Sequence, residues 1–115
     1  MKRQTDIELL KEPFKTKIKE LIQMLEEKGL SFKVFETLRD AKRQQYLLKT
    51  GASRIKRSKH QDAIACDFVH FKHGKYDWND ISAYKELGEC VHEIGGLVWG
   101  GDWKKFKDYV HVELK

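Results

Sequence analysis

Two histidines and two carboxylates occur in this chain at spacings that suit a metal site. His60 precedes Asp67 by seven residues, and near the C-terminus Asp108 precedes His111 by three. Catalytic zinc commonly keeps three ligands of the imidazole, carboxylate or thiolate type and leaves a fourth position open. His60, Asp67 and His111 would form such a set. Asp108 would then be free to transfer protons in a metal-assisted hydrolysis.

The segment between the first two candidate ligands must bend. On a continuous extended strand His60 and Asp67 would lie about 23 Å apart, at about 3.3 Å per residue, too far to share one ion. We therefore predict a bend at Gln61-Asp62, followed by a strand over residues 63–69. In that strand Asp67 shares a face with two alanines, at positions 63 and 65, which should leave open space beside the carboxylate.

The C-terminal segment alternates over residues 109–114 and predicts a second strand. Its apolar face carries Val110, Val112 and Leu114, whereas His111 lies on the opposite face. Asp108 cannot share the face of His111 on a regular strand, because residues an odd number of positions apart point to opposite faces. We expect Asp108 on the loop before the strand, turned toward the attacking water.

Arg39 lies at a predicted junction between a strand over residues 31–38 and a helix over residues 41–50 that Asp40 would cap. Such an arginine could stabilise an oxyanion on the attacked carbonyl, or it could be an ordinary surface residue. Residues 52–59 follow as a basic loop with four cations in eight residues. The loop could clamp an acidic ligand or simply be solvated.

The remaining elements are scaffold. Apolar residues at helical spacing predict a helix from Pro13 to Gly29, and a second one capped by Asn79 or Asp80 that ends at Gly95-Gly96. A turn at His73-Gly74 and a short strand over residues 97–99 complete the pattern. The expected fold is α+β, with a small antiparallel sheet and two to three packed helices.

Composition sets broad limits. The 115 residues fit one domain, 1–115, in which residues 1–12 would be an N-terminal extension. The net charge of +5 favours an anionic partner, for which nucleic acid, an anionic membrane face and a cell-wall polymer all qualify; simple solubility would explain the charge equally well. Two cysteines without a paired spacing indicate reduced thiols. The sequence shows no apolar segment of the kind found in signal peptides or membrane spans, so we expect the protein to be made in the cytoplasm. We also expect a monomer.

The combined motifs resemble the LAS-type zinc metallopeptidases, which include D-alanyl-D-alanine carboxypeptidases and dipeptidases. The motifs are Ser58-x-His60, Ala65-x-Asp67, the stretch Trp99-Gly100-Gly101-Asp102-Trp103, and Asp108-x-x-His111. The segment 36–44, which contains Arg39 and Gln44, is similar to the arginine-bearing junction of that family. The resemblance spans about residues 13–115 and is greatest to the L-alanyl-D-glutamate endopeptidases found among phage endolysins.

This resemblance implies a zinc enzyme that cleaves the L-alanyl-D-glutamate bond of the peptidoglycan stem peptide. His60, Asp67 and His111 would hold one Zn²⁺ per chain, Asp108 would be the general acid-base, and Arg39 would stabilise the transition state. Ser58, Gln44, Trp99, Asp102 and Trp103 would support the metal or contact the substrate. An enzyme of this type without a signal peptide would reach the wall through a phage holin pore. We expect no separate cell-wall-binding domain besides the catalytic one.

Two positions depart from the family pattern. Glycine is frequent where this chain has Ala63, and an aromatic residue is common where Leu38 stands. A D,D-carboxypeptidase or dipeptidase on the same scaffold remains the nearest alternative, and an inactive relative that keeps zinc structurally is another. A basic nucleic-acid-binding domain is the rival of a different class, but the sequence carries no signature of one, so we expect no nucleic-acid partner and no membrane insertion.

Overall fold

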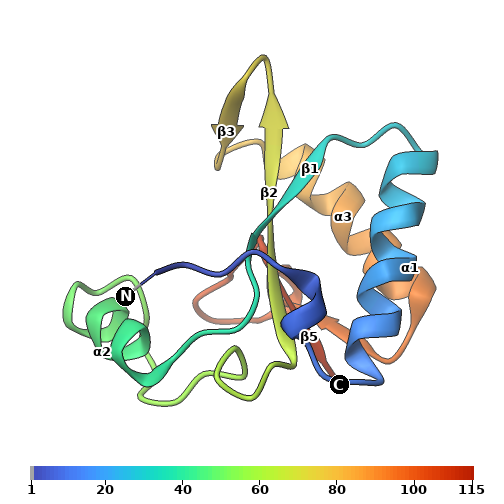
Figure 1. The fold of residues 1–115 in the computed structure, drawn as a ribbon. Helices are drawn as coiled ribbons and strands as arrows, with labels where there is room; N and C mark the ends of the chain where they lie inside the picture. Colours follow the sequence, from blue (N-terminus) through green and yellow to red (C-terminus); the bar gives the residue numbers. More distant parts are fainter. Residues whose placement is uncertain (1) are drawn as a thin grey trace.

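The structure, a computed structural model, describes residues 2–115 and has the predicted α+β fold (Figure 1). Five strands form one antiparallel sheet: β1 (Phe32–Glu36), β2 (Ala65–Lys72), β3 (Lys75–Asp77), β4 (Leu97–Trp99) and β5 (His111–Leu114). The strand order is β1-β2-β5-β4, and β3 lies off this path, paired with the C-terminal part of β2. The long strand β2 therefore contacts three neighbours and carries Asp67 at the centre of the sheet.

Two long helices cover one face of the sheet. These are α1 (Phe14–Glu27) and α3 (Ile81–Ile94), which lie together on one side of the strands in Figure 1. Helix α1 buries Phe14, Ile18, Leu21 and Leu25 at helical spacing, and these side chains pack with Cys66, Phe68 and Val112 from the sheet. The core therefore takes one face of β2 and β5, and the alternation of the strands turns Asp67 and His111 to the other face.

The short helix α2 (Ala41–Lys49) lies apart from that core, on the other side of the sheet (Figure 1). Its N-terminus is capped by Asp40, whose side chain accepts a hydrogen bond from the Arg43 backbone N–H at 2.8 Å, as the sequence predicted. Two short 3-10 helices, η1 (Ile7–Leu9) and η2 (Gly100–Asp102), complete the elements. None of the helices in residues 2–115 is both long and apolar enough to cross a membrane.

Strand boundaries differ from the predictions at three places. The strand predicted over residues 31–38 is the shorter β1, Phe32–Glu36. The strand predicted over residues 63–69 begins at Ala65 and continues to Lys72, because its last residues pair with β3 across the turn at His73-Gly74. The strand predicted over residues 109–114 begins only at His111. There the His111 N–H donates to the carbonyl of Asp108 at 3.2 Å, which closes a turn instead of extending the strand.

Residues 1–12 were expected to be an extension, but the described part of this segment is built into the domain. Leu10 is buried in the main core. The backbone N–H of Thr37 donates to Gln4 at 2.8 Å, and that of Lys11 donates to Ala63 at 3.0 Å. The segment thus fixes the backbone on both sides of the site, next to Arg39 and at the start of β2.

Candidate metal centre

The bend predicted at Gln61-Asp62 exists and brings the first histidine back to the sheet. Residues 59–63 form successive turns, and Ala63 has a φ of 60°. A non-glycine residue in this left-handed region has a conformational cost of roughly 1–2 kcal/mol. Glycine would avoid this cost at position 63. The buried methyl group of Ala63 offsets part of that cost, at about 0.8 kcal/mol per buried carbon.

Strand register aligns the carboxylate with its neighbours. Asp67 is paired with His111 on β5 and with Glu36 on β1, so the three side chains lie side by side on one face of the sheet. His60 Nε2 lies 3.2 Å from Asp67 Oδ1, and His111 Nδ1 lies 3.2 Å from the same oxygen. The structure therefore brings together the three residues that the sequence singled out.

The geometry of these three residues fits a zinc ion. One ligand atom from each of His60, Asp67 and His111 lies within 4.8 Å of the other two, and all three residues are buried. Zinc binds nitrogen and oxygen ligands at about 2.0–2.2 Å, so ligand atoms around one ion are separated by little more than 3 Å. Two imidazoles and one carboxylate that already stand 3.2 Å apart suit this requirement.

In both histidines an outer partner contacts one ring nitrogen, and the other ring nitrogen is directed toward Asp67 and the candidate metal position. His60 Nδ1 lies 2.7 Å from the carbonyl oxygen of Thr37, to which it can donate. His111 Nε2 lies 2.8 Å from Glu113 Oε1, and Glu113 in turn pairs with Lys59 at 2.7 Å. Outer partners of this kind orient a ligating imidazole and raise its basicity.

The charges around the centre reinforce one another. Burial by itself would raise the pKa of Asp67, but His60 and His111 hold it far below its ordinary value. Burial likewise lowers the pKa of His111, yet its hydrogen bonds to Asp67 and Glu113 and the nearby negative charges raise that pKa to about 9. A cation bound at this position therefore competes with a proton for His111.

Arg39 lies beside the centre in a fixed orientation. Its Nη2 donates to Glu36 at 2.9 Å and stands 3.7 Å from Asp67 Oδ2, and its Nη1 donates to Gln44 at 2.9 Å. Gln44 is itself held by Ser53 and by the carbonyl of Ile55. The arginine is thus a buried, oriented cation and not the ordinary surface residue that the sequence left open.

Asp108 stands on the turn before β5, as predicted. Its backbone N–H donates to Gly100 at 3.1 Å, and its side chain is exposed to the same cleft that His60, Asp67 and His111 line. Desolvation by the surrounding protein, and then the negative charge of Asp67, raise the pKa of Asp108. A carboxyl group with a raised pKa is suited to exchange protons near neutral pH.

The cleft has a volume of about 920 Å³ and runs from the basic loop to the segment before β5. Its walls combine aromatic side chains with cations, among them Trp78, Trp103, Phe106, Arg54 and Lys107. Ala63 and Ala65 were expected to open this space, but both are buried and neither lines the cleft. The open volume instead adjoins Asp67 and His111, and its walls come from α2, from part of β1 and from the loops around the site.

The five residues expected to support the site fall into different places. Ser58 lies in the cleft wall, and its hydroxyl accepts from the His60 N–H at 3.1 Å. Trp103 also lines the cleft, with its ring 5.1 Å from that of His111. Gln44 acts through its hydrogen bond to Arg39. Trp99 and Asp102 do not line the cleft: Trp99 is buried, and Asp102 is exposed and pairs with His92 at 2.5 Å.

Three outer residues of the site were not singled out from the sequence. These are Glu36, Thr37 and Glu113, which hold Arg39, His60 and His111 respectively. Of these three, only Glu113 could have been predicted from the sequence. It follows His111 by two residues and must therefore share its face of β5. The other two are brought to the site by strand pairing and by the bend.

Gly100 allows the close contact that positions Asp108. A Cβ atom at this position would lie 2.2 Å from the carbonyl oxygen of Asp108 and 3.1 Å from the Cβ of His111. We expect Gly100→Ala to push the 103–110 loop away from β4, lowering any hydrolytic activity at least about tenfold and stability by about 1–3 kcal/mol. Activity assays and thermal melts of the purified variant measure both effects.

Gly74→Ala is the matched control for that substitution. Gly74 has a φ of 75° on the β2–β3 turn, and a Cβ atom added there would meet no other atom within 4 Å. The alanine strains the turn by about 1 kcal/mol and leaves the cleft untouched. Equal activity losses in the two variants would contradict a specific role for the Gly100 contact.

Comparison with known proteins places this chain in a family. The family model described as phage L-alanyl-D-glutamate peptidase matches residues 3–114. The L-alanyl-D-glutamate peptidase of Listeria phage A118 is 31% identical over 87% of this chain and 36% of its own length. The peptidoglycan L-alanyl-D-glutamate endopeptidase CwlK of Bacillus subtilis is 33% identical over 76% of this chain and 62% of its own length. The chain thus spans less than two thirds of either relative.

Solved structures have the same fold. The L-Ala D-Glu endopeptidase ChiX of Serratia marcescens superposes with a TM-score of 0.78 at 27% identity, over 95% of this chain and 83% of that one. The D,D-pentapeptidase VanY of a VanB-type resistance cassette, solved as a mutant with Zn(II), superposes with a TM-score of 0.68 at 14% identity, over 91% and 72% of the two chains. At that identity the likeness to VanY concerns the fold alone. Because the family model covers nearly the whole sequence, the chain belongs to the phage L-alanyl-D-glutamate peptidase family.

Proposed function

We propose that this protein is a zinc-dependent endopeptidase that cleaves the L-alanyl-D-glutamate bond of the peptidoglycan stem peptide. The observation that carries the proposal is the convergence of His60, Asp67 and His111 in one cleft, with Asp108 and Arg39 beside them. The names of the relatives supply the substrate, and the donor set supports zinc. The one zinc ion would act as a Lewis acid, polarising a carbonyl and lowering the pKa of water.

Asp108 is proposed to move the proton in this reaction. It would take a proton from the attacking water and return it to the amine of the departing D-glutamate, as a general base and then a general acid. Its position on the turn before β5 supports this role, since the side chain is accessible to the cleft while its backbone is fixed by Gly100 and His111. Its raised pKa supports the second half of the cycle, in which it must hold a proton.

Arg39 is proposed to stabilise the oxyanion that develops on the attacked carbonyl. Its guanidinium is held on one side by Glu36 and on another by Gln44, so little reorganisation is needed when negative charge appears. Arg43 also pairs with Glu36 at 2.5 Å, which anchors that carboxylate from the outside. The preorganised arginine contrasts with the exposed cations of the cleft wall, such as Arg54.

The cations of the cleft wall are proposed to bind the carboxylates of the stem peptide, in which D-glutamate contributes an anionic group. Arg54 stacks over the ring of Phe106 at 4.1 Å and projects from the basic loop. We expect Arg54→Glu to raise KM about tenfold with a smaller change in kcat, because it replaces attraction by repulsion before the chemical step. Steady-state kinetics on soluble stem peptides measure the two constants.

Lys85→Glu provides the matched control for that charge reversal. Lys85 is exposed on α3 and does not line the cleft, yet its substitution changes the net charge by the same amount. A KM that rises equally in both variants would show that only the overall charge matters, and would contradict substrate binding by Arg54.

Digestion of purified peptidoglycan tests the proposed function directly. Zinc-loaded protein is expected to free the amino group of D-glutamate, detected by labelling and hydrolysis of the fragments. Release of D-alanine without new D-glutamate amino groups would instead assign a D,D-carboxypeptidase. Absence of both products, in protein shown to hold zinc, would overturn the proposal in favour of a structural metal.

A further inference from the structure

A second cluster of metal-ligating side chains lies at the far end of β2. His70, Asp77 and Asp80 each offer one ligand atom, and these atoms lie within 4.8 Å of one another. His70 is paired directly with Asp77 across the β2–β3 hairpin, and Asp80 caps the N-terminus of α3. The cluster is thus fixed by three elements of the fold, and none of its members lines the substrate cleft.

His70 has a buried ring nitrogen that lacks a partner. Its Nδ1 stands 3.7 Å from Asp77 Oδ2 and 4.0 Å from Asp80 Oδ2, beyond hydrogen-bonding distance from either. Among residues 2–115, the buried side-chain polar atoms without a hydrogen-bond partner are this nitrogen and Nε of Arg39. Buried polar groups are nearly always satisfied, by protein, by water or by an ion. The Nδ1 atom is therefore expected to contact a water molecule or an ion that lies between the histidine and the two carboxylates.

The ring cannot easily turn away to satisfy itself. It packs against Phe32 at 5.3 Å and against Tyr84 at 6.4 Å between ring centres, and the His70 backbone N–H donates to the Tyr84 hydroxyl at 3.0 Å. These contacts fix the strand and limit rotation of the side chain. The free nitrogen is consequently held facing the carboxylates.

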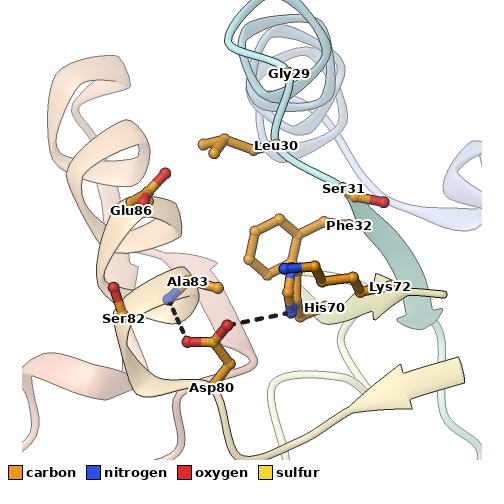
Figure 2. Close-up of a pocket in the computed structure, with 10 residues that line it drawn as sticks. All are labelled: Gly29, Leu30, Ser31, Phe32, His70, Lys72, Asp80, Ser82, Ala83 and Glu86. Atoms are coloured by element: carbon orange, nitrogen blue, oxygen red, sulfur yellow. Dashed lines mark hydrogen bonds and ion pairs between the residues drawn. The ribbon is translucent and has the colours of Figure 1, made fainter.

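Each carboxylate is already oriented by one oxygen and offers the other. Asp80 accepts from the Ala83 N–H at 3.1 Å through Oδ1, and Figure 2 shows its second oxygen directed toward His70. Asp77 accepts from the Asn79 N–H at 3.0 Å through Oδ1, which leaves Oδ2 on the side of His70. The two free oxygens and the ring nitrogen form one face of a coordination shell.

We propose that His70, Asp77 and Asp80 form a second metal site, for a divalent transition-metal ion of the zinc class. The two carboxylates can neutralise a divalent charge, and an imidazole ligand favours zinc over magnesium or calcium. A pocket of about 290 Å³ adjoins His70 and Asp80 and provides room for water to complete the shell (Figure 2). To share one ion the ligand atoms must approach one another by roughly 0.5–1 Å, which the partly exposed Asp77 and Asp80 allow.

An ion bound at this site would influence the substrate cleft through the position of Trp78. This residue lies between the two aspartates in sequence, lines the cleft, and stacks edge-on against Phe35 with ring centres 4.9 Å apart. Clamping Asp77 and Asp80 to β2 would hold the 77–80 segment, and with it the aromatic wall. The second site therefore acts on the shape of the cleft and takes no part in the chemistry.

Metal stoichiometry tests the site independently of activity. Full-length protein is dialysed against Zn²⁺ alone, and bound zinc per chain is measured for the wild type and for the Asp77→Asn/Asp80→Asn double variant. Both asparagines keep an oxygen that can accept from Asn79 and Ala83, so the turn and the helix cap are retained. We expect two zinc equivalents in the wild type and one in the variant, with affinity at the second site weakened at least about a hundredfold.

His92→Gln/Asp102→Asn is the control, because it removes an exposed histidine-aspartate pair that is no part of either three-residue cluster. This control is expected to keep two equivalents, and His70→Gln provides a second variant if the double substitution disturbs folding. The inference would be overturned if both cluster variants kept two zinc equivalents. It would also be overturned if the wild type bound a single equivalent and Asp67→Asn removed it. A single equivalent removed by the cluster variants and not by Asp67→Asn would support this site and contradict the proposed catalytic one.

Discussion

Asp108→Asn is expected to abolish hydrolysis while zinc remains bound. Asparagine has nearly the same shape as aspartate but cannot exchange a proton, and general acid-base groups contribute about 10²–10⁴-fold to rate. Asp108 lies outside the three-residue cluster of His60, Asp67 and His111, so the metal content should not change. We expect kcat to fall at least about a hundredfold with KM nearly constant, measured on soluble stem peptides alongside bound-zinc analysis.

Asp102→Asn is the matched control for that variant. It makes the same chemical change on a nearby loop, at an exposed carboxylate that pairs with His92 and does not line the cleft. Its activity should stay within about twofold of the wild type, since exposed ion pairs contribute roughly 0–1 kcal/mol. Full activity in Asp108→Asn, or loss of zinc together with activity, would contradict the proton-transfer role.

Asp67→Asn is expected to have the largest effect on the protein as a whole. The carboxylate of Asp67 contacts His60 and His111 at 3.2 Å and Arg39 at 3.7 Å, in a buried position. Removing its charge eliminates a metal ligand and leaves the Arg39 cation buried with less compensation, which typically costs about 3–5 kcal/mol. We expect loss of one zinc equivalent, loss of hydrolysis, and a clear decrease in the thermal midpoint.

Chelation separates the loss of metal from the loss of the fold. Wild-type protein treated with a chelator should lose activity and regain it when Zn²⁺ is added back, whereas Asp67→Asn should regain none. Asp62→Asn is the control, because Asp62 is a more exposed carboxylate paired with Arg57 at the bend and is expected to change stability by less than about 1 kcal/mol. Activity in chelated protein, with zinc shown to be absent, would contradict a metal mechanism.

The outer residues of the site orient the proposed metal ligands before any ion binds. His60 is held by a backbone carbonyl, whereas His111 is held by Glu113, a residue that Lys59 anchors in turn. The Thr37 carbonyl belongs to a backbone segment that the N-terminal residues tie down through Gln4. Preorganisation of this kind spares the ion the cost of ordering its ligands. Residues 2–12 are therefore part of the site's support.

Residue spacing and alternation predicted which residues could do chemistry and on which elements they lie. The spacing of His60 and Asp67 required a bend, and the structure has successive turns at residues 59–63. The alternation around Asp67 and around His111 predicted which face of the sheet each side chain occupies. Side chains on any strand alternate between the two faces with a period of two. The helix cap Asp40 was predicted, and Asp80 was one of two candidates with Asn79, because a cap depends on only a few neighbouring residues.

Which of these residues contact one another depends on long-range pairing in the folded chain. The pairing of Asp67 with both His111 and Glu36 is a matter of strand register between segments far apart in the sequence, and local patterns carry no information about it. The burial of Trp99 follows from Gly88 and Gly101, where added Cβ atoms would come within 2.4 Å and 2.2 Å of its ring. The second cluster depends in the same way on the β2–β3 register and the start of α3. Local spacing therefore defined the candidate ligands, and long-range pairing selected their partners.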